Sequence, residues 1–174
     1  MKTLKIKLNK ATKLKKFLEQ DIREDNDLVN KWNQIIKGNT REVDIKQIEE
    51  LKNVKSEFLI NLHLVITVAN LKKGKDEEYS NAYYIKKLSE LQQQKKFMMM
   101  LRTANGKQLS DDKKTTIEYD SLITSSEVTN QIKYLNKEID NLQNKLTAFN
   151  ESSTVSITYD PLLKELIESV GIEV

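Results

Sequence analysis

One segment carries the clearest structural signal in the chain: residues 124–149 read TSSEVTNQIKYLNKEIDNLQNKLTAF. Thr124 followed by Glu127 is typical of a capping box, which starts a helix. The apolar residues that follow have a steady four-then-three spacing, and we expect them to form a helix-packing or interface seam: Val128, Ile132, Leu135, Ile139, Leu142, Leu146 and Phe149. Uninterrupted heptads of this kind indicate coiled-coil-type packing. Because the seam is narrow, we expect this helix to be one arm of a long hairpin.

Two more segments upstream have helical spacing. Apolar residues recur every three or four positions over residues 11–35, and Asp25 interrupts that stripe. Asp44 is expected to begin a second helix, whose stripe over residues 48–69 is interrupted by Lys55. Both segments therefore predict amphipathic helices with one charged residue on the apolar side.

A third helix is expected over residues 81–102, and short strands are expected elsewhere. Alternating apolar and polar residues predict strands at 3–8, 116–120 and 155–159, which we expect to form one small sheet capping the helices. Pro161 is typical of the first position of a helix, so a final short helix is expected there.

The predicted fold is mainly α: long antiparallel helical hairpins with coiled-coil-type packing, plus a small β element from short strands. The expected domains are a helical hairpin domain at 1–150 and a C-terminal strand with a short docking helix at 151–174. The tail helix has an apolar face that could dock on its own body or on a neighbour, formed by Leu162, Leu163, Leu166 and Ile167.

Composition argues against most enzyme chemistry. The 174 residues include no cysteine and one histidine, His63, which excludes thiolate sites and makes a histidine-built metal site unlikely to form. The acidic run at 21–27 could bind a divalent cation, but it lacks the spacing of a calcium loop, and a solvated helix face is the favoured interpretation. Met98-Met99-Met100 could bind apolar partners, but core packing is favoured, with Met98 and Met99 near the core. We expect no enzyme, no cofactor and no metal.

Charge is distributed unevenly along a chain of net charge +3. Residues 1–41 carry 11 Lys and Arg against 5 Asp and Glu, whereas residues 117–174 carry 4 against 10. Opposed charges of this kind suit segments that lie against one another, within a chain or between copies. A contact with nucleic acid or an anionic surface is the alternative use of the lysine-rich start, through Lys2, Lys5, Lys7, Lys10, Lys13, Lys15 and Lys16. The chain has only three arginines, and base readout favours arginine, so specific nucleic-acid recognition is not expected.

The order of these elements resembles the septicolysin-like family of small helical proteins. The resemblance covers roughly residues 7–150, from Lys7-Leu8-Asn9-Lys10-Ala11-Thr12-Lys13-Leu14-Lys15-Lys16 at the start, through the helix end Leu64-Val65-Ile66-Thr67-Val68-Ala69-Asn70, to the strand Thr116-Ile117-Glu118-Tyr119 before the heptad helix. The chain departs from the family in lacking an arginine- and serine-rich lead-in to that strand and in its tail from Ser152. The resemblance implies a helical, self-associating protein and transfers no catalytic or pore residues.

Taken together, these patterns predict a non-enzymatic, self-assembling structural or scaffold protein. A phage or virion structural component belongs to the same class, and a binder of nucleic acid or anionic surfaces is the alternative. We expect a homo-oligomer, possible other protein partners and no small-molecule substrate. No stretch is long and apolar enough to span a bilayer, and Met1–Lys7 lacks the apolar core of a signal peptide. A cytoplasmic location, or a place within an assembled particle, is therefore expected.

Overall fold

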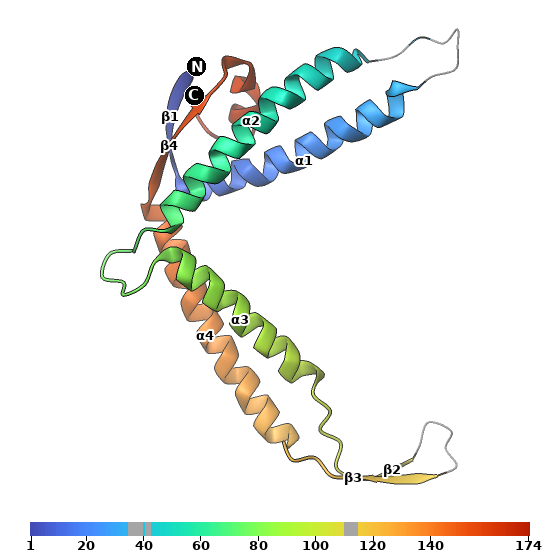
Figure 1. The fold of residues 1–174 in the computed structure, drawn as a ribbon. Helices are drawn as coiled ribbons and strands as arrows, with labels where there is room; N and C mark the ends of the chain where they lie inside the picture. Colours follow the sequence, from blue (N-terminus) through green and yellow to red (C-terminus); the bar gives the residue numbers. More distant parts are fainter. Residues whose placement is uncertain (35–39, 41–42, 110–114) are drawn as a thin grey trace. The chain divides into compact units, whose positions relative to one another are not determined.

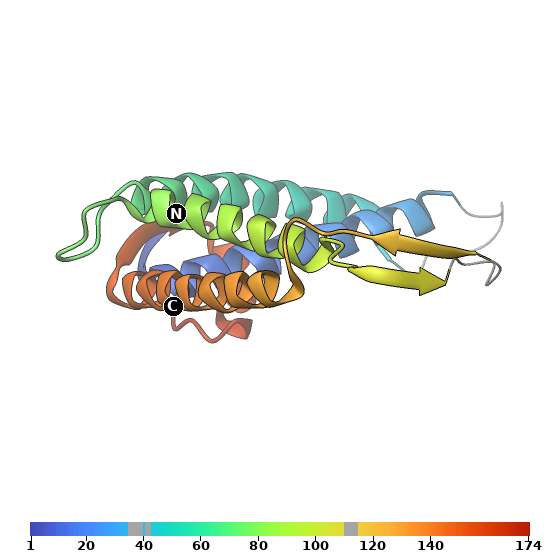
Figure 2. The same ribbon diagram turned by 90° about the horizontal axis from the view of Figure 1, so that it is seen from below.

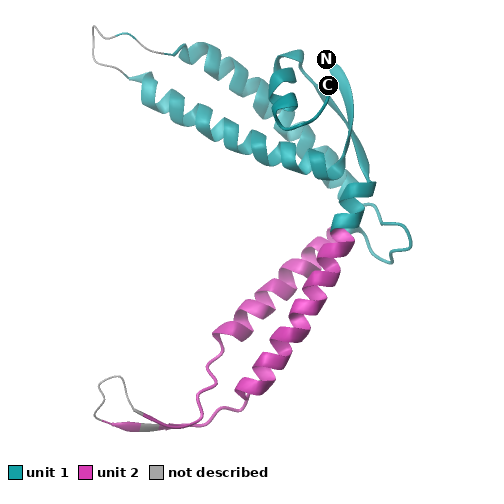
Figure 3. Ribbon diagram, turned by 180° about the vertical axis from the view of Figure 1, so that it is seen from behind, with its two compact units in different colours: residues 1–81, 147–174 teal, residues 82–146 magenta. Residues whose placement is uncertain are grey.

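A computed structural model describes residues 1–34, 40, 43–109 and 115–174, and within them the chain is mainly helical (Figure 1). Two helix pairs dominate, with a small two-stranded sheet in each part of the molecule. The chain divides into two compact units, residues 1–81 with 147–174 and residues 82–146, coloured separately in Figure 3.

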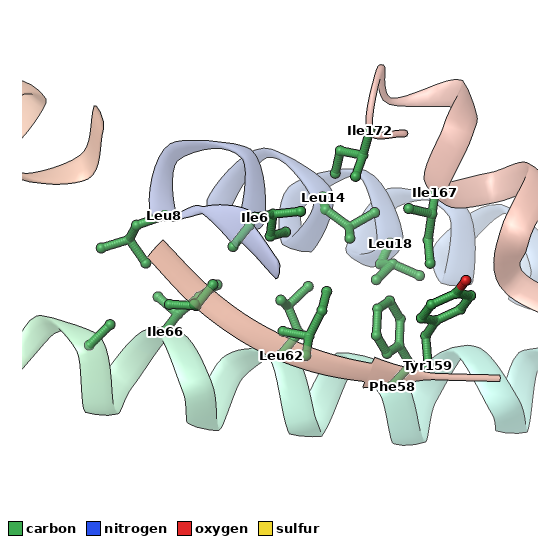
Figure 4. Close-up of a cluster of buried hydrophobic side chains, with 14 of the residues drawn as sticks. Ile6, Leu8, Leu14, Leu18, Phe58, Leu62, Ile66, Tyr159, Ile167 and Ile172 are labelled. Carbon is green, nitrogen blue, oxygen red and sulfur yellow. The ribbon is translucent and has the colours of Figure 1, made fainter. Parts of the chain in front are cut away.

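The first unit is built on a helical hairpin of α1 (Leu8–Asn33) and α2 (Ile45–Asn70). The predicted start of α2 at Asp44 is confirmed, because its Oδ1 accepts hydrogen bonds from the backbone N–H groups of Lys46 (3.0 Å) and Gln47 (3.2 Å). Between the helices lies a buried cluster that includes the small side chains of Ala11 and Ala69, which allow close helix packing. Figure 4 shows its larger members, with Leu14 and Leu18 of α1 above Phe58 and Leu62 of α2.

A two-stranded antiparallel sheet completes this unit. Strand β1 (Lys2–Lys7) pairs with β4 (Thr154–Tyr159), with Leu4 opposite Ile157 and Ile6 opposite Val155. The side chains of Ile6, Val155 and Ile157 are buried in the same cluster as the hairpin core. The sheet therefore closes one side of the α1–α2 hairpin.

The C-terminal tail belongs to this unit and not to a domain of its own. After β4 comes a short 3-10 turn, η1 (Pro161–Leu163), capped by Asp160, and then α5 (Lys164–Ser169). Because β4 pairs with β1 at the other end of the chain, the tail cannot separate from the start of the sequence. The predicted boundary at residue 150 therefore does not coincide with a boundary between units.

The second unit contains α3 (Asn81–Met100) except for its first residue, and the part of α4 (Ser125–Ser152) up to Leu146; the two helices run antiparallel (Figure 1). The capping box predicted at the start of α4 is confirmed in both directions: the Glu127 N–H donates to Thr124 Oγ1 (3.2 Å), and the Thr124 N–H donates to Glu127 Oε2 (2.8 Å). These hydrogen bonds, first from the Thr124 backbone and then from its hydroxyl, hold the pKa of Glu127 below its ordinary value.

A separate hairpin of strands joins these two helices. Strand β2 (Gly106–Leu109) pairs antiparallel with β3 (Thr116–Tyr119), and Figure 2 shows them side by side. The prediction of one sheet from all three expected strands is therefore wrong: β3 pairs with its sequence neighbour β2, and β1 pairs with β4. Strand β2, which begins at Gly106 with a φ of 81°, was not predicted from the sequence.

Candidate interaction surfaces

The apolar seam of α4 is used for packing inside the chain. Of its seven residues, Val128, Leu135, Ile139, Leu142 and Phe149 are buried, and Ile132 and Leu146 are half-buried. Phe149 belongs to the core of the first unit, and the others lie along the part of α4 that pairs with α3. A contact between copies would therefore need other residues than this seam.

A groove of about 440 Å³ lies between α3 and α4, and its lining is mostly polar. It includes Lys95 and Met99 from α3 and Ile139 and Asp140 from α4. Met98 is half-buried, but Met99 is 66% exposed and Met100 72% exposed. The expectation that Met99 packs near the core is therefore wrong, because the groove leaves its side of α3 open.

A buried charge cluster joins the two helices of the first unit. Lys55 of α2 is 5% exposed, and its Nζ lies 2.6 Å from Asp25 Oδ2 in a hydrogen bond and 2.6 Å from Asp21 Oδ2. The two aspartates are one helical turn apart on α1, so both carboxylates face the same ammonium group. Asp21 and Asp25 are thus partners of Lys55 and not part of a solvated helix face.

The charge state of Lys55 is fixed by this cluster. Burial alone lowers the pKa of a lysine, but hydrogen bonds and charge from Asp21 and Asp25 outweigh it, and the net shift of the Lys55 pKa is upward. One sequence signal was available: the intruding Asp25 and the intruding Lys55 carry opposite charges on facing apolar stripes. The cluster is an ion pair between the two helices of the first unit.

The outer face of α2 has an apolar stripe that was not predicted from the sequence. Ile60, Leu64, Val68 and Leu71 are 68%, 59%, 51% and 65% exposed. Their spacing of four, four and three residues places them on one side of the helix, opposite the buried Phe58, Leu62 and Ala69. We call these four residues the outer stripe. The second half of α2 is therefore apolar on two opposite faces.

The lysine-rich start is exposed over most of its length. Lys2, Lys5, Lys7, Lys10, Lys13 and Lys16 are exposed, and Lys15 is half-buried. Two of these lysines have contacts within the chain, because Lys10 Nζ donates to the Gly171 carbonyl (3.1 Å) and Lys15 pairs with Glu19 (3.3 Å). Lys5 and Lys7 lie on the exposed face of β1, opposite Ser156 and Thr154 of β4. The structure thus places six of these seven lysines on the surface.

The apolar face of the tail packs on the chain's own body. Leu163 and Ile167 are 1% and 0% exposed, Leu166 is half-buried against the same core, and only Leu162 remains exposed, at 70%. Of the two uses that the sequence left open for this tail, the structure shows docking on the first unit.

Neither a metal-binding cluster nor a membrane-spanning helix occurs among the residues that the structure describes. Among those residues, no cluster of three or more His, Asp or Glu side chains could hold a metal ion. His63 is exposed on α2, one residue from the buried Leu62. Within the same residues, no helix combines the length and apolar character that crossing a membrane requires.

The fold defines a class of protein with two antiparallel helix pairs and a small two-stranded sheet in each unit. A crystal structure of this class is that of a functionally unknown conserved protein from Corynebacterium diphtheriae, which matches 87% of this chain and 99% of its own with a TM-score of 0.76. The two sequences are 15% identical, so the likeness shows a shared fold and nothing about function. No family model and no curated protein matches the chain.

Proposed function

We propose that the protein is a non-enzymatic, self-assembling structural or scaffold protein that acts through its helical surfaces. The observation that carries this proposal is the outer stripe of α2, in which four aliphatic side chains remain more than half exposed on one side of a helix. Contiguous exposed apolar patches are uncommon on monomeric proteins and mark sites of protein association.

The chemistry of the remaining surfaces supports the same proposal. The buried charges of the first unit are paired with each other, and the seam of α4 is occupied by packing within the chain. Membership of the septicolysin-like family is part of this proposal, supported by the residue pattern from Lys7 to Asn150 and by the helical fold. A role as a phage or virion component is a narrower form of it, which genome context would test.

Binding to an anionic surface is a second candidate function. It is favoured by the exposure of Lys5, Lys7, Lys13 and Lys16 around β1 and the first turns of α1. Binding of duplex DNA or anionic vesicles that weakens steeply with salt would support it. Absent binding at low salt would exclude this use of the lysines.

Absolute mass in solution tests the main proposal. Light scattering over a concentration series, at two salt concentrations, should give a mass above the 20.2 kDa of one chain. A complex that forms through apolar side chains should persist at the higher salt concentration, because screening weakens charge contacts and not apolar burial. A mass of 20.2 kDa at every concentration would refute self-assembly.

A further inference from the structure

We infer that two copies pair through the outer stripe of α2, antiparallel to each other, around a two-fold axis that passes the helix between residues 65 and 66. This inference rests on the proposed function, because it names the partner and the geometry of self-assembly. Two independent features of α2 point to this geometry: the symmetry of the stripe and the charges near its two ends.

The stripe is complementary to itself when its direction is reversed. With the axis between residues 65 and 66, Ile60 lies opposite Leu71 of the partner subunit, and Leu64 lies one residue, about 1.5 Å along the helix, from the level of Val68 of the partner subunit. Each pair joins two aliphatic side chains that are at least half exposed in one chain. A two-fold contact uses the same patch on both copies, and this patch satisfies that condition.

Charge at the two ends of the stripe favours the antiparallel arrangement. Glu57 is exposed just before the stripe, one turn ahead of Ile60 on the same side of the helix. Exposed lysines follow Leu71 directly, at Lys72, Lys73 and Lys75. Antiparallel pairing brings the Glu57 of each copy to the lysines of the other, whereas parallel pairing would place like charges together at both ends.

The same features favour a second copy over an unrelated partner. Glu57 at one end of the stripe is opposite in charge to Lys72, Lys73 and Lys75, which directly follow its other end, so a second copy supplies the matching charge. The seam of α4 offers no such face, because its apolar side chains are already packed within the chain. The outer stripe is thus an apolar patch with a charge pattern that its own copy fits.

Cross-linking of introduced cysteines tests the direction of pairing. The chain has no cysteine, so Ile60→Cys and Leu71→Cys each provide one reactive thiol. A short bismaleimide should join the two variants when they are mixed, with one carrying a tag, and should join neither variant to itself. Two copies of position 60 would lie about 17 Å apart along the paired helices, from eleven residues at 1.5 Å each.

Charge reversal tests the ends of the stripe. Glu57→Lys should raise the dissociation constant of the dimer about tenfold or more at low salt, because each copy would then place a lysine against lysines. Adding Lys72→Glu and Lys75→Glu to the Glu57→Lys chain should return the dissociation constant to within about threefold of the wild-type value. Glu50→Lys is the matched control: it makes the same charge change on the same helix, two turns away from Glu57, and should leave the dissociation constant unchanged.

The outcomes separate this inference from the proposed function. A wild-type chain that stays monomeric overturns both. A wild-type oligomer in which Ile60→Cys cross-links to itself, or in which Glu57→Lys changes nothing, overturns the antiparallel geometry while self-assembly stands. Circular dichroism on each variant shows whether a loss of dimer comes from unfolding. Cross-linking only in the mixture, together with rescue by the lysine changes, supports the inference.

Discussion

Replacing Lys55 by methionine should strongly destabilise the first unit. Methionine has about the length of lysine and keeps its apolar contacts, but it removes the ammonium group that lies 2.6 Å from Asp21 and Asp25. The variant therefore leaves two carboxylates facing each other between α1 and α2 without a cation. Uncompensated charge in a partly buried position costs more than the pair itself contributes.

The magnitude follows from how buried each group is. Removing one partner of a fully buried ion pair costs about 3–5 kcal/mol. Here the side chains of Asp21 and Asp25 are still 27% and 14% exposed, so water relieves part of the repulsion. We therefore expect the free energy of unfolding to fall by about 2–3 kcal/mol at neutral pH.

Urea unfolding followed by tryptophan fluorescence measures this change. The one tryptophan, Trp32, lies on α1 and reports on the unit that holds the cluster. Lys13→Met, at an exposed position on α1, is the matched control and should change stability by less than about 0.5 kcal/mol.

Two results would refute the reasoning about this cluster. One is a Lys55→Met variant as stable as the Lys13→Met control. The other is a variant with Lys55→Met, Asp21→Asn and Asp25→Asn that recovers none of the lost stability. Neutral amides remove the repulsion between the two carboxylates, so part of the free energy of unfolding should return.

Three further outcomes are expected. The pKa of Lys55 is raised in the folded state, so the stability that its charge contributes is complete below the ordinary pKa of 10.5 and is lost as pH rises through the higher folded pKa. The difference in free energy of unfolding between wild type and Lys55→Met, measured by urea unfolding, should therefore shrink above pH 10.5. Thr124→Ala removes the side-chain cap of α4 and should lower the free energy of unfolding by about 1 kcal/mol, measured by circular dichroism. Because the pKa of Glu127 is lowered in the folded state, the stability from the capping box is present above pH 4.5 and should fade as pH falls through the lower folded pKa. Leu62→Ala, at a fully buried position, should lower the free energy of unfolding by about 2–5 kcal/mol, measured by thermal unfolding. Leu64→Ala, on the exposed face of the same helix, should change the free energy of unfolding of the monomer by less than about 0.5 kcal/mol.

The helices were largely predictable because their signals are local. The apolar spacing of α4, its capping box at Thr124 and the cap of α2 at Asp44 depend on residues within a few positions of one another. The strands were harder, because β1 and β4 pair across almost the whole chain and nothing near Ile6 specifies Val155 as its partner. The alternation showed that strands exist, and only the structure shows which of them pair.

The charge cluster shows a different limit of sequence reasoning. Taken separately, Asp25 and Lys55 each interrupt an apolar stripe, and neither of them alone indicates a buried ion pair. Together they neutralise each other across the hairpin, because α1 and α2 place them opposite one another. The pairing of two interruptions is visible only when the two helices are known to face each other at these positions.

The outer stripe follows from the same kind of three-dimensional information. Residues 58–71 form an uncharged run of fourteen, which polar residues such as Asn61, His63 and Thr67 make unsuitable for a membrane span. The helix places its apolar residues on two opposite sides, with Leu62 buried and Leu64 59% exposed. A helix that packs in its own core on one side needs only that side to be apolar. Packing within the first unit therefore does not account for the second apolar side, and that is the physical reason to place a second copy on it.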